Sequence, residues 1–514
     1  MSALCRTDRS AVAFRAAVIL TTLVAQRSVA MEPSVARDTI VIEDLKRHVG
    51  FLASDSLEGR EAGSRGGQAA ATYLAHEFRQ LGLTPSGDDG DFFQEFGHGY
   101  RNVLALLPGS DPEKRQEVII LGGHYDHVGY GNSSNSYGPF GQIHNGADDN
   151  ASGTAAILEV AEAFSQLDTP PQRSILFALW DAEEAGLLGS AHWVKQPTFS
   201  LDRVKLAINI DMIGRLRNDR LITYGERTAN GLRQSIVDAN ELSGLSIDFD
   251  PKHREDSDHW TFFQQNIPYL MLHTGEHPEY HRPSDDAHLL NYDGLHRVSQ
   301  MMFTLTSIMG ETDDLGEFRE DSRRQPSHRS PRHVPPAQRP SRLGLAWEGQ
   351  RRPDEPYLVT RVVANSPAAA SGIRVGDRIT GINGREVSPG LDLRQAVLTS
   401  VRTIRFRIAR DQVTEPFEVT VQLRGQPVRL GIHWKPDPDR PRSVIVTGVI
   451  TGSPAEQAGL RANDRLHPPN SSQATGPDWL QILTEAADDL ITLNVDRDGQ
   501  VEEVRIRLFP TPAS

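Results

Sequence analysis

Short apolar runs of strand length alternate with helical patterns in the first half of the chain. The runs cover 102–107, 118–121, 174–180 and 206–210. Between the second and third runs, residues 153–167 place four apolar side chains on one helical face: Ile157, Val160, Ala161 and Phe164. This alternation is typical of an α/β domain with a mainly parallel central sheet flanked by helices. We expect that domain to cover residues 31–310.

Acidic and imidazole side chains follow these runs directly. His124 and Asp126 follow the second run, and the adjacent pair Glu183 and Glu184 follows the third. The remaining groups are Asp148 and Asp149 in a turn before the helix, Asp211 after the fourth run, and His281 in a later loop. Open parallel sheets keep their ligand crevices at the carboxyl ends of strands, and carboxylates and imidazoles are the ligands of zinc. The pattern therefore predicts a metal site at this edge.

As a set, these motifs resemble metallopeptidase family twenty-eight, whose members are co-catalytic zinc exopeptidases. The resemblance begins at Leu57-Glu-Gly-Arg-Glu-Ala-Gly-Ser64, continues through Asn102-Val-Leu-Ala, and extends to about Gly310. It implies two zinc ions per chain, with His124 and Asp211 on one, Glu184 and His281 on the other, and Asp149 bridging both. It also implies that Glu183 is the general base and that Asp126 holds the imidazole of His124.

Asp149 is preferred to Asp148 because the family places its bridging Asp four residues before the Gly of a Ser-Gly pair, here Gly153. The same resemblance implies a cis peptide between Asp149 and Asn150. No ligand position is substituted, which argues against an inactive relative of the transferrin-receptor kind and against a single-metal glutaminyl cyclase.

The implied activity is hydrolysis of N-terminal residues from peptides by a two-zinc-activated water, on substrates with a free N-terminus. A carboxypeptidase is the alternative within the enzyme class, because the same metal centre serves both ends of a peptide. The short spacing between Arg101 and His124 leaves no room for the inserted domain of many carboxypeptidase-like relatives. A scaffold protein with a relic peptidase domain is the non-enzyme alternative.

The C-terminal part contains an internal repeat with an offset of 87 residues. Gly344-Leu-Ala-Trp347 recurs as Gly431-Ile-His-Trp434, and the Ser-Pro-Ala motif at Ser366 recurs at Ser453. Both copies resemble PDZ domains, over 342–424 and 428–509. The resemblance implies that the loop at Leu343–Ala346 can bind a peptide or protein C-terminus. The second copy departs from the pattern at His467-Pro-Pro-Asn470.

Residues 311–341 are rich in Arg, Pro and Ser and show no apolar period, so we expect a solvated linker. A polyanion-binding segment is the alternative interpretation of its basic residues. All the predicted metal ligands precede this linker. We therefore expect the chemistry not to depend on the PDZ-like pair.

Residues 1–30 have the pattern of an export signal. Three arginines precede the apolar stretch 16–25, and Ser28-Val-Ala30 offers a cleavage site. A membrane anchor is the alternative, but this stretch is about half the length that a bilayer crossing needs. We expect a periplasmic or extracellular protein without a transmembrane helix after cleavage. Its single cysteine, Cys5, lies in the signal, and a net charge of -14 argues against nucleic acid as a partner.

Overall fold

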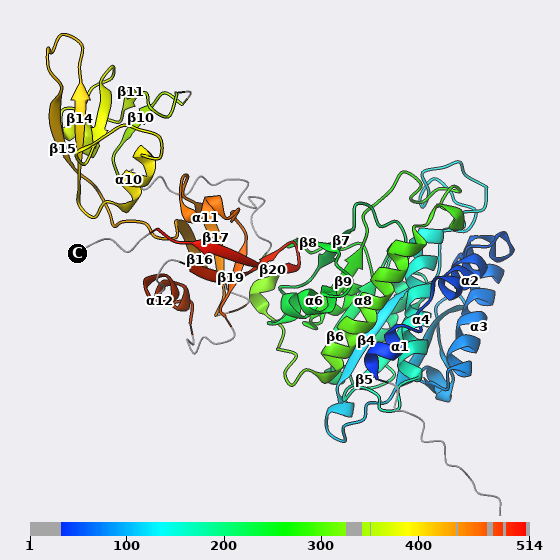
Figure 1. Cartoon of the computed structure of the whole chain (residues 1–514). Coiled ribbons are helices and arrows are strands. Elements are labelled where there is room, and N and C mark those ends of the chain that lie inside the picture. Colours follow the sequence, from blue (N-terminus) through cyan, green and yellow to red (C-terminus); the bar gives the residue numbers. More distant parts are fainter. Residues whose placement is uncertain are drawn as a thin grey trace, which may run out of the picture.

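The computed structural model describes residues 32–324, 342–349, 351–437, 440, 442–469, 476–486 and 490–509. The predicted export signal and residues 325–341 of the predicted linker lie outside the described residues. The described part contains an N-terminal α/β domain and two small β-rich modules (Figure 1). Among the described residues, no helix combines the length and the apolar character needed to span a membrane.

A nine-stranded sheet forms the centre of the α/β domain. Its strand order is β1-β3-β5-β4-β6-β9-β7-β8, with β2 paired to β3. The strands are β1 (Thr84–Pro85), β2 (Phe93–Phe96), β3 (Tyr100–Leu107), β4 (Val118–His124), β5 (Ser174–Trp180), β6 (Val204–Ile210), β7 (Arg220–Tyr224), β8 (Ser246–Asp250) and β9 (Tyr269–His273). The four central strands β5, β4, β6 and β9 are parallel, whereas β3 and β7 join them antiparallel.

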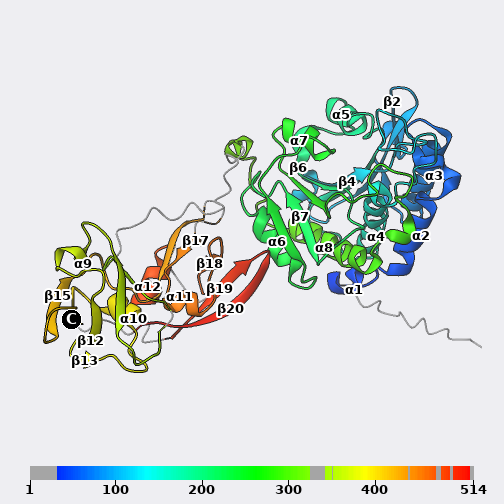
Figure 2. The ribbon, with the colours of Figure 1, turned by 90° about the horizontal axis from the view of Figure 1, so that it is seen from above.

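Helices cover both faces of this sheet (Figure 2). One face is covered by α1 (Pro33–Arg37), α2 (Ile42–Leu52), α3 (Arg65–Gln80), α4 (Gly153–Ser165), α6 (Leu232–Asn240) and α8 (Tyr292–Glu311). The other face is covered by α5 (Leu188–Lys195) and α7 (His259–Gln264). The predicted α/β class and its mainly parallel centre are confirmed.

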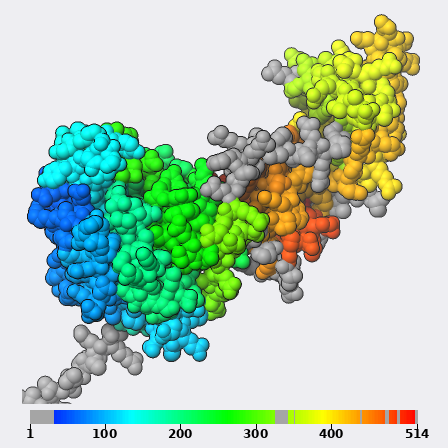
Figure 3. Space-filling view, turned by 180° about the vertical axis from the view of Figure 1, so that it is seen from behind, coloured from blue at the N-terminus to red at the C-terminus, as the bar shows by residue number. Residues whose placement is uncertain are grey.

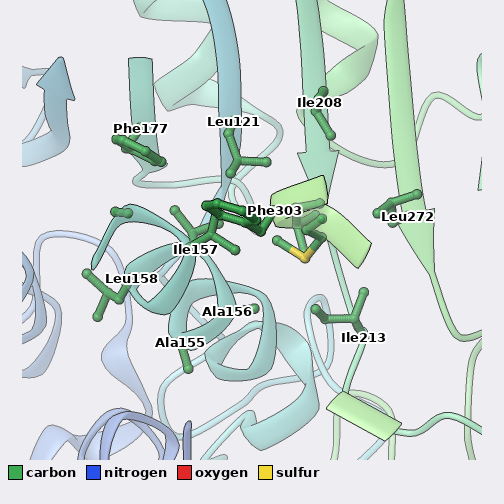
Figure 4. Close-up of a cluster of buried hydrophobic side chains, with 14 of the residues drawn as sticks. Leu121, Ala155, Ala156, Ile157, Leu158, Phe177, Ile208, Ile213, Leu272 and Phe303 are labelled. Carbon is green, nitrogen blue, oxygen red and sulfur yellow. The ribbon is translucent and has the colours of Figure 1, made fainter. Parts of the chain in front are cut away.

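The central strands are mostly apolar because both of their faces are buried. On β5, Phe177 points into the larger core, where Figure 4 shows it near Leu121 and Ile157, whereas Trp180 packs on the opposite face. The predicted apolar face of α4 is buried in the larger core. This packing fixes the carboxyl ends of the strands, from which the polar side chains emerge.

The peptidase-like domain continues beyond the predicted boundary at residue 310. The side chain of Ser322 is buried, and the ring of Phe318 lies 5.7 Å from that of Phe263. The amide of Arg319 donates to the carbonyl of Thr228 at 2.8 Å. The prediction that the solvated linker begins at residue 311 is therefore wrong, since the many charged side chains of 311–324 obscured the few apolar ones, Leu315 and Phe318, that pack against the domain.

The two C-terminal modules share one topology. The first contains β10 (Leu345–Trp347), β11 (Tyr357–Val362), α9 (Pro367–Ala370), β12 (Arg378–Ile382), β13 (Arg385–Glu386), α10 (Leu393–Thr399), β14 (Thr403–Ala409) and β15 (Phe417–Gln422). The second contains β16 (Ile432–Pro436), β17 (Val444–Val449), α11 (Pro454–Gln457), β18 (Arg465–His467), α12 (Trp479–Ala486), β19 (Leu490–Arg497) and β20 (Gln500–Arg507). Figure 3 shows the second module between the α/β domain and the first module.

Candidate metal centre and active site

The predicted site residues converge at the carboxyl edge of the parallel strands. His124 is the last residue of β4, and Asp211 directly follows β6. Glu183 and Glu184 lie three and four residues after β5. Asp149 lies in the irregular turn Ala147–Ser152 that leads into α4, and His281 lies in the loop after β9. Strand ends that are adjacent in the sheet thus bring together residues separated by up to 157 positions (281 − 124) in the chain.

Asp149 directs its two carboxylate oxygens toward two different groups of ligands. Its Oδ1 lies 3.2 Å from Nε2 of His124, which in turn lies 3.5 Å from Oδ1 of Asp211. Its Oδ2 lies 3.1 Å from Nε2 of His281. The peptide between Asp149 and Asn150 is cis, as the family resemblance implies. A carboxylate in this position has the geometry of a bridging ligand.

The second group contains a histidine that the sequence analysis did not assign. Glu184 places Oε2 at 3.1 Å from Nε2 of His281 and Oε1 at 2.8 Å from Nδ1 of His127. His127 is buried, and its Nδ1 lies 3.8 Å from Oδ2 of Asp149. Its position three residues after His124, in the same strand-exit motif, is the signal that could have identified it.

Asp148 belongs to a separate buried network. Its Oδ1 accepts the amide of Gly214 at 2.6 Å, and its Oδ2 lies 3.2 Å from Nε2 of His277. Asp285 accepts the main-chain amides of both Asp148 and Asp149, at 3.0 and 3.1 Å. This arrangement fixes the backbone of the turn and supports Asp149 over Asp148 as the residue that faces the site.

Asp126 acts on the glutamate turn more directly than on His124. Its carboxylate accepts the main-chain amides of Glu183 at 3.0 Å and Glu184 at 3.3 Å. The carboxylate lies 3.8 Å from Nδ1 of His124, and that nitrogen lies within hydrogen-bond distance, 3.2 Å, of the main-chain oxygen of Asp126. The predicted carboxylate–imidazole hydrogen bond is therefore not formed in this arrangement, because Nδ1 of His124 faces the main-chain oxygen of Asp126 and lies beyond hydrogen-bond distance of its carboxylate.

Arg60 is a fully buried cation beneath the site that the sequence analysis also did not assign. Its guanidinium donates to the carbonyl of Tyr125 at 2.9 Å, and to those of Asn145 and Gly146 at 2.5 and 3.0 Å. Burial lowers its pKa to about 10, although nearby carboxylates, Asp149 first among them, favour the charged form. Arg60 thus links two segments of the site. One is the segment directly after β4, which carries Asp126, and the other precedes the turn that carries Asp149.

Burial also separates the carboxylates by their acidity. In the protein alone, burial raises the pKa of Glu183 well above its ordinary value, and the carboxylates of Glu184 and Asp258 raise it further. Burial likewise raises the pKa of Asp258 to about 7. Burial opposes ionisation of Asp149 as well, but His124 and His281 hold its pKa well below the usual range. The raised pKa means that the carboxylate of Glu183 accepts a proton more readily than an exposed glutamate does.

The donor set fits a zinc-type cation. Two groups each place one ligand atom per residue within 4.8 Å of one another: His124, Asp149 and Asp211, and His127, Asp149 and Glu184. Asp149 is common to both. Several carboxylates buried together repel one another, and a bound divalent cation would offset that repulsion. Imidazole nitrogens and carboxylate oxygens are zinc ligands, and no cysteine is needed.

A cavity of about 250 Å³ opens onto these residues. Glu183 lines it together with the ligand candidates His124, Asp149, Glu184, Asp211 and His281. Leu187, Met212 and Met271 contribute apolar surface, and Arg254, Glu255 and Asp256 contribute charged side chains from one loop. The cavity therefore joins the metal-binding edge to a region large enough for an amino-acid side chain.

Two regions of the chain match known protein families. Residues 102–306 match the model described as "Peptidase family M28", and residues 358–408 match that of the PDZ domain. The chain is similar to leupeptin-inactivating enzyme 1 of Streptomyces exfoliatus, with 29% identity over 51% of this chain and 55% of that protein. This chain therefore spans only about half the length of that curated relative.

Two further proteins are matched over a larger share of their own length. The uncharacterized protein YfbL of Escherichia coli (strain K12) is 30% identical over 46% of this chain and 78% of its own length. The crystal structure of Legionella pneumophila LapA aminopeptidase aligns with 19% identity and a TM-score of 0.46, over 60% of this chain and 81% of that one. The family match over the site residues, together with the extent of the YfbL match, leads to one conclusion: the chain belongs to peptidase family M28 and carries a PDZ domain.

Proposed function

We propose that this protein is an exported aminopeptidase that binds two zinc ions and removes N-terminal residues from peptides. The observation that carries the proposal is the orientation of Asp149, whose two oxygens face two separate groups of ligand side chains. His124 and Asp211 would hold one ion, and Glu184 and His281 the other. His127 is positioned to hold Glu184 or to join the second group.

Bound zinc would supply Lewis-acid polarisation of the scissile carbonyl and would lower the pKa of the attacking water. Glu183 would accept a proton from that water and pass it to the leaving amine, a role that its raised pKa favours. Asp126 would keep Glu183 and Glu184 in place through their main-chain amides. Arg60 would hold the loops on which His124 and Asp149 lie.

The direct test is a panel of aminoacyl p-nitroanilides, each with a free and with an N-acetylated amine. Acetylation removes the ammonium group that the carboxylate-rich cavity would bind, so we expect hydrolysis of the free amides alone. Equal rates on free and blocked substrates would contradict the aminopeptidase proposal. Release of C-terminal residues from blocked peptides would instead support a carboxypeptidase.

Metal content tests the ligand assignment independently of activity. Asp149→Ala should lose zinc, measured by atomic spectroscopy of dialysed protein, because both groups would lose their shared oxygen donor. Asp148→Ala is the matched control and should retain zinc, since its carboxylate faces Gly214 and His277. The reverse result would move the bridging role to Asp148. Wild-type protein without zinc would support a scaffold.

We further propose that the first module binds a peptide C-terminus along β10. This strand ends the strand order of its sheet, so one of its edges is unpaired among the described strands. The loop at Leu343–Ala346 precedes and begins this strand. Binding of C-terminal peptides with free and amidated carboxyl groups would test this role, and equal affinity would contradict it. Export is tested by sequencing the mature N-terminus, which we expect at Met31.

A further inference from the structure

The turn between β19 and β20 reaches strand β8 of the peptidase sheet (Figures 1 and 2). The amide of Ile247 in β8 donates to the carbonyl of Asp498 at 2.7 Å. The buried side-chain amide of Asn240 donates to the carbonyl of Gly499 at 3.0 Å, and the exposed side-chain amide of Gln500 donates to the carbonyl of Gly244 at 3.1 Å. The second module therefore satisfies polar groups of the peptidase domain with two backbone carbonyls and the side chain of Gln500.

A largely buried ion pair lies next to this turn. Arg233 on α6 lies 3.2 Å from Asp496, and their side chains are only 11% and 2% exposed. The same guanidinium lies 3.5 Å from the ring centroid of Phe249 on β8. Burying one of these charges without the other would be strongly unfavourable. The two buried charges therefore compensate each other across the contact between the domains.

The turn is also shaped to fit against β8. Asp498 and Gly499 have φ values of 51° and 75°, as in a two-residue turn with two left-handed positions. A β-carbon on Gly499 would lie 2.5 Å from Cγ1 of Ile247. Only glycine meets both requirements, namely the left-handed backbone and the absence of a side chain at the contact.

Strand β8 leads directly into the charged rim of the cavity. It is the last strand of the sheet and pairs with β7 on one side, so its other edge is where the turn docks. Phe249, beneath Arg233, is five residues before Arg254, which lines the cavity together with Glu255 and Asp256. The position of β8 therefore sets the start of the cavity loop 251–258.

We propose that the second PDZ-like module is a fixed docking partner of β8 and that, through β8, it positions the cavity loop 251–258. In this arrangement the module is a structural part of the peptidase domain, and its β19–β20 turn is the docking element. The first module, which does not make these contacts, is the one left to bind other molecules.

Hydrogen–deuterium exchange of the full-length chain tests this proposal without reference to activity. Gly499→Val should increase the exchange rate of amides in 245–256 on the order of tenfold, because the Ile247 amide loses its acceptor and the loop loses its anchor. Gln412→Val is the matched control, since Gln412 is an exposed turn residue of the first module with a φ of 70°. It should leave exchange in 245–256 unchanged.

Asp496→Asn is a second variant, needed in case Gly499→Val unfolds the whole module. It weakens the ion pair with Arg233 but leaves the turn unchanged. It should also accelerate exchange in 245–256, by less than Gly499→Val does. Unchanged exchange in 245–256 in Asp496→Asn and Gly499→Val would overturn the docking. Faster exchange at Ile247 with unchanged exchange in 251–256 would overturn the positioning of the loop.

A kinetic measurement adds a second readout, which rests on the proposed aminopeptidase function. For L-leucine p-nitroanilide we expect Gly499→Val to raise KM several-fold while kcat stays within about twofold, because the loop lines the cavity and holds none of the metal ligands. Unchanged KM would overturn the positioning. If the wild-type chain did not hydrolyse this amide, the proposed function would fail, and the exchange in 251–256 would still decide the present inference.

Discussion

The two PDZ-like modules are built alike but relate differently to the peptidase domain. Arg410 forms two hydrogen bonds with the buried carboxylate of Asp377, at 2.7 and 2.8 Å. The equivalent residues 87 positions later, Arg497 and Asp464, repeat this pair at 2.9 and 2.7 Å. The internal scaffold of the repeat is thus preserved. Only the second module, however, places its last hairpin against strand β8.

A few positions in that hairpin account for the difference. Asp496, which pairs with Arg233, is replaced in the first module by Ala409, and Gly499 is replaced by Gln412. The hairpin connection of the first module is also longer, since it covers residues 410–416. A duplicated domain can therefore keep its fold and still acquire a docking surface through two residue replacements and a shorter turn.

The largest effect is expected in the peptidase domain, on kcat, and effects in the modules can be compared with it. Replacing Glu183 with Gln should lower kcat by roughly 10² to 10⁴, the usual contribution of a general base. Zinc content and exchange in 245–256 should remain as in the wild type, because Glu183 contacts neither the hairpin nor β8. This variant separates loss of chemistry from loss of docking. Near-normal kcat would show that another group transfers the proton.

Truncation tests where the peptidase domain ends. A chain ending at Gly310 should lose on the order of 3–5 kcal/mol of unfolding free energy relative to one ending at Arg324, because Phe318 and Ser322 would be missing from their buried positions. Denaturant titration of both chains measures this difference. Equal stability would show that 311–324 is a linker after all.

The buried ion pair should have a smaller but measurable effect. Asp496→Ala should reduce the unfolding free energy by about 3 kcal/mol, because Arg233 would keep a largely buried charge without its partner. A double-mutant cycle with Arg233→Ala isolates the interaction between the two side chains. Additive effects of the two substitutions would contradict a direct coupling between the module and α6.

The smallest effect is expected in the first module. Its exposed pair Arg405 and Glu418 is separated by 3.7 Å, with side chains 60% and 55% exposed. Glu418→Ala should change the unfolding free energy by no more than about 0.5 kcal/mol, because solvent screens this pair. Denaturant titration measures the unfolding free energy of both variants, Glu418→Ala and Asp496→Ala. A loss as large as that of Asp496→Ala would mean that the first hairpin also has a buried contact.

Local patterns in the sequence were sufficient to place most of the residues at the candidate metal-binding edge. Continuous apolar runs identified β4, β5 and β6 because parallel strands are buried on both faces, and the residues directly after them included the predicted ligands. The resemblance to the family, applied to the position of Gly153, favoured Asp149 over Asp148, and the carboxylate of Asp149 faces the two ligand groups. The offset of 87 identified two copies of one module, since a repeat needs only a comparison of the chain with itself.

Only the tertiary structure showed which side chains interact with residues far away in the sequence. Arg60 bonds to carbonyls up to 86 residues away, and Arg233 pairs with Asp496 across 263 residues. The carboxylate of Asp126 bonds to amides 57 and 58 residues later instead of to the neighbouring imidazole. Periodicity and motif spacing describe a residue and its near neighbours, whereas these contacts depend on how strands and domains meet. The residue types gathered at this edge could therefore be predicted from the sequence, but the docking of the second module could not.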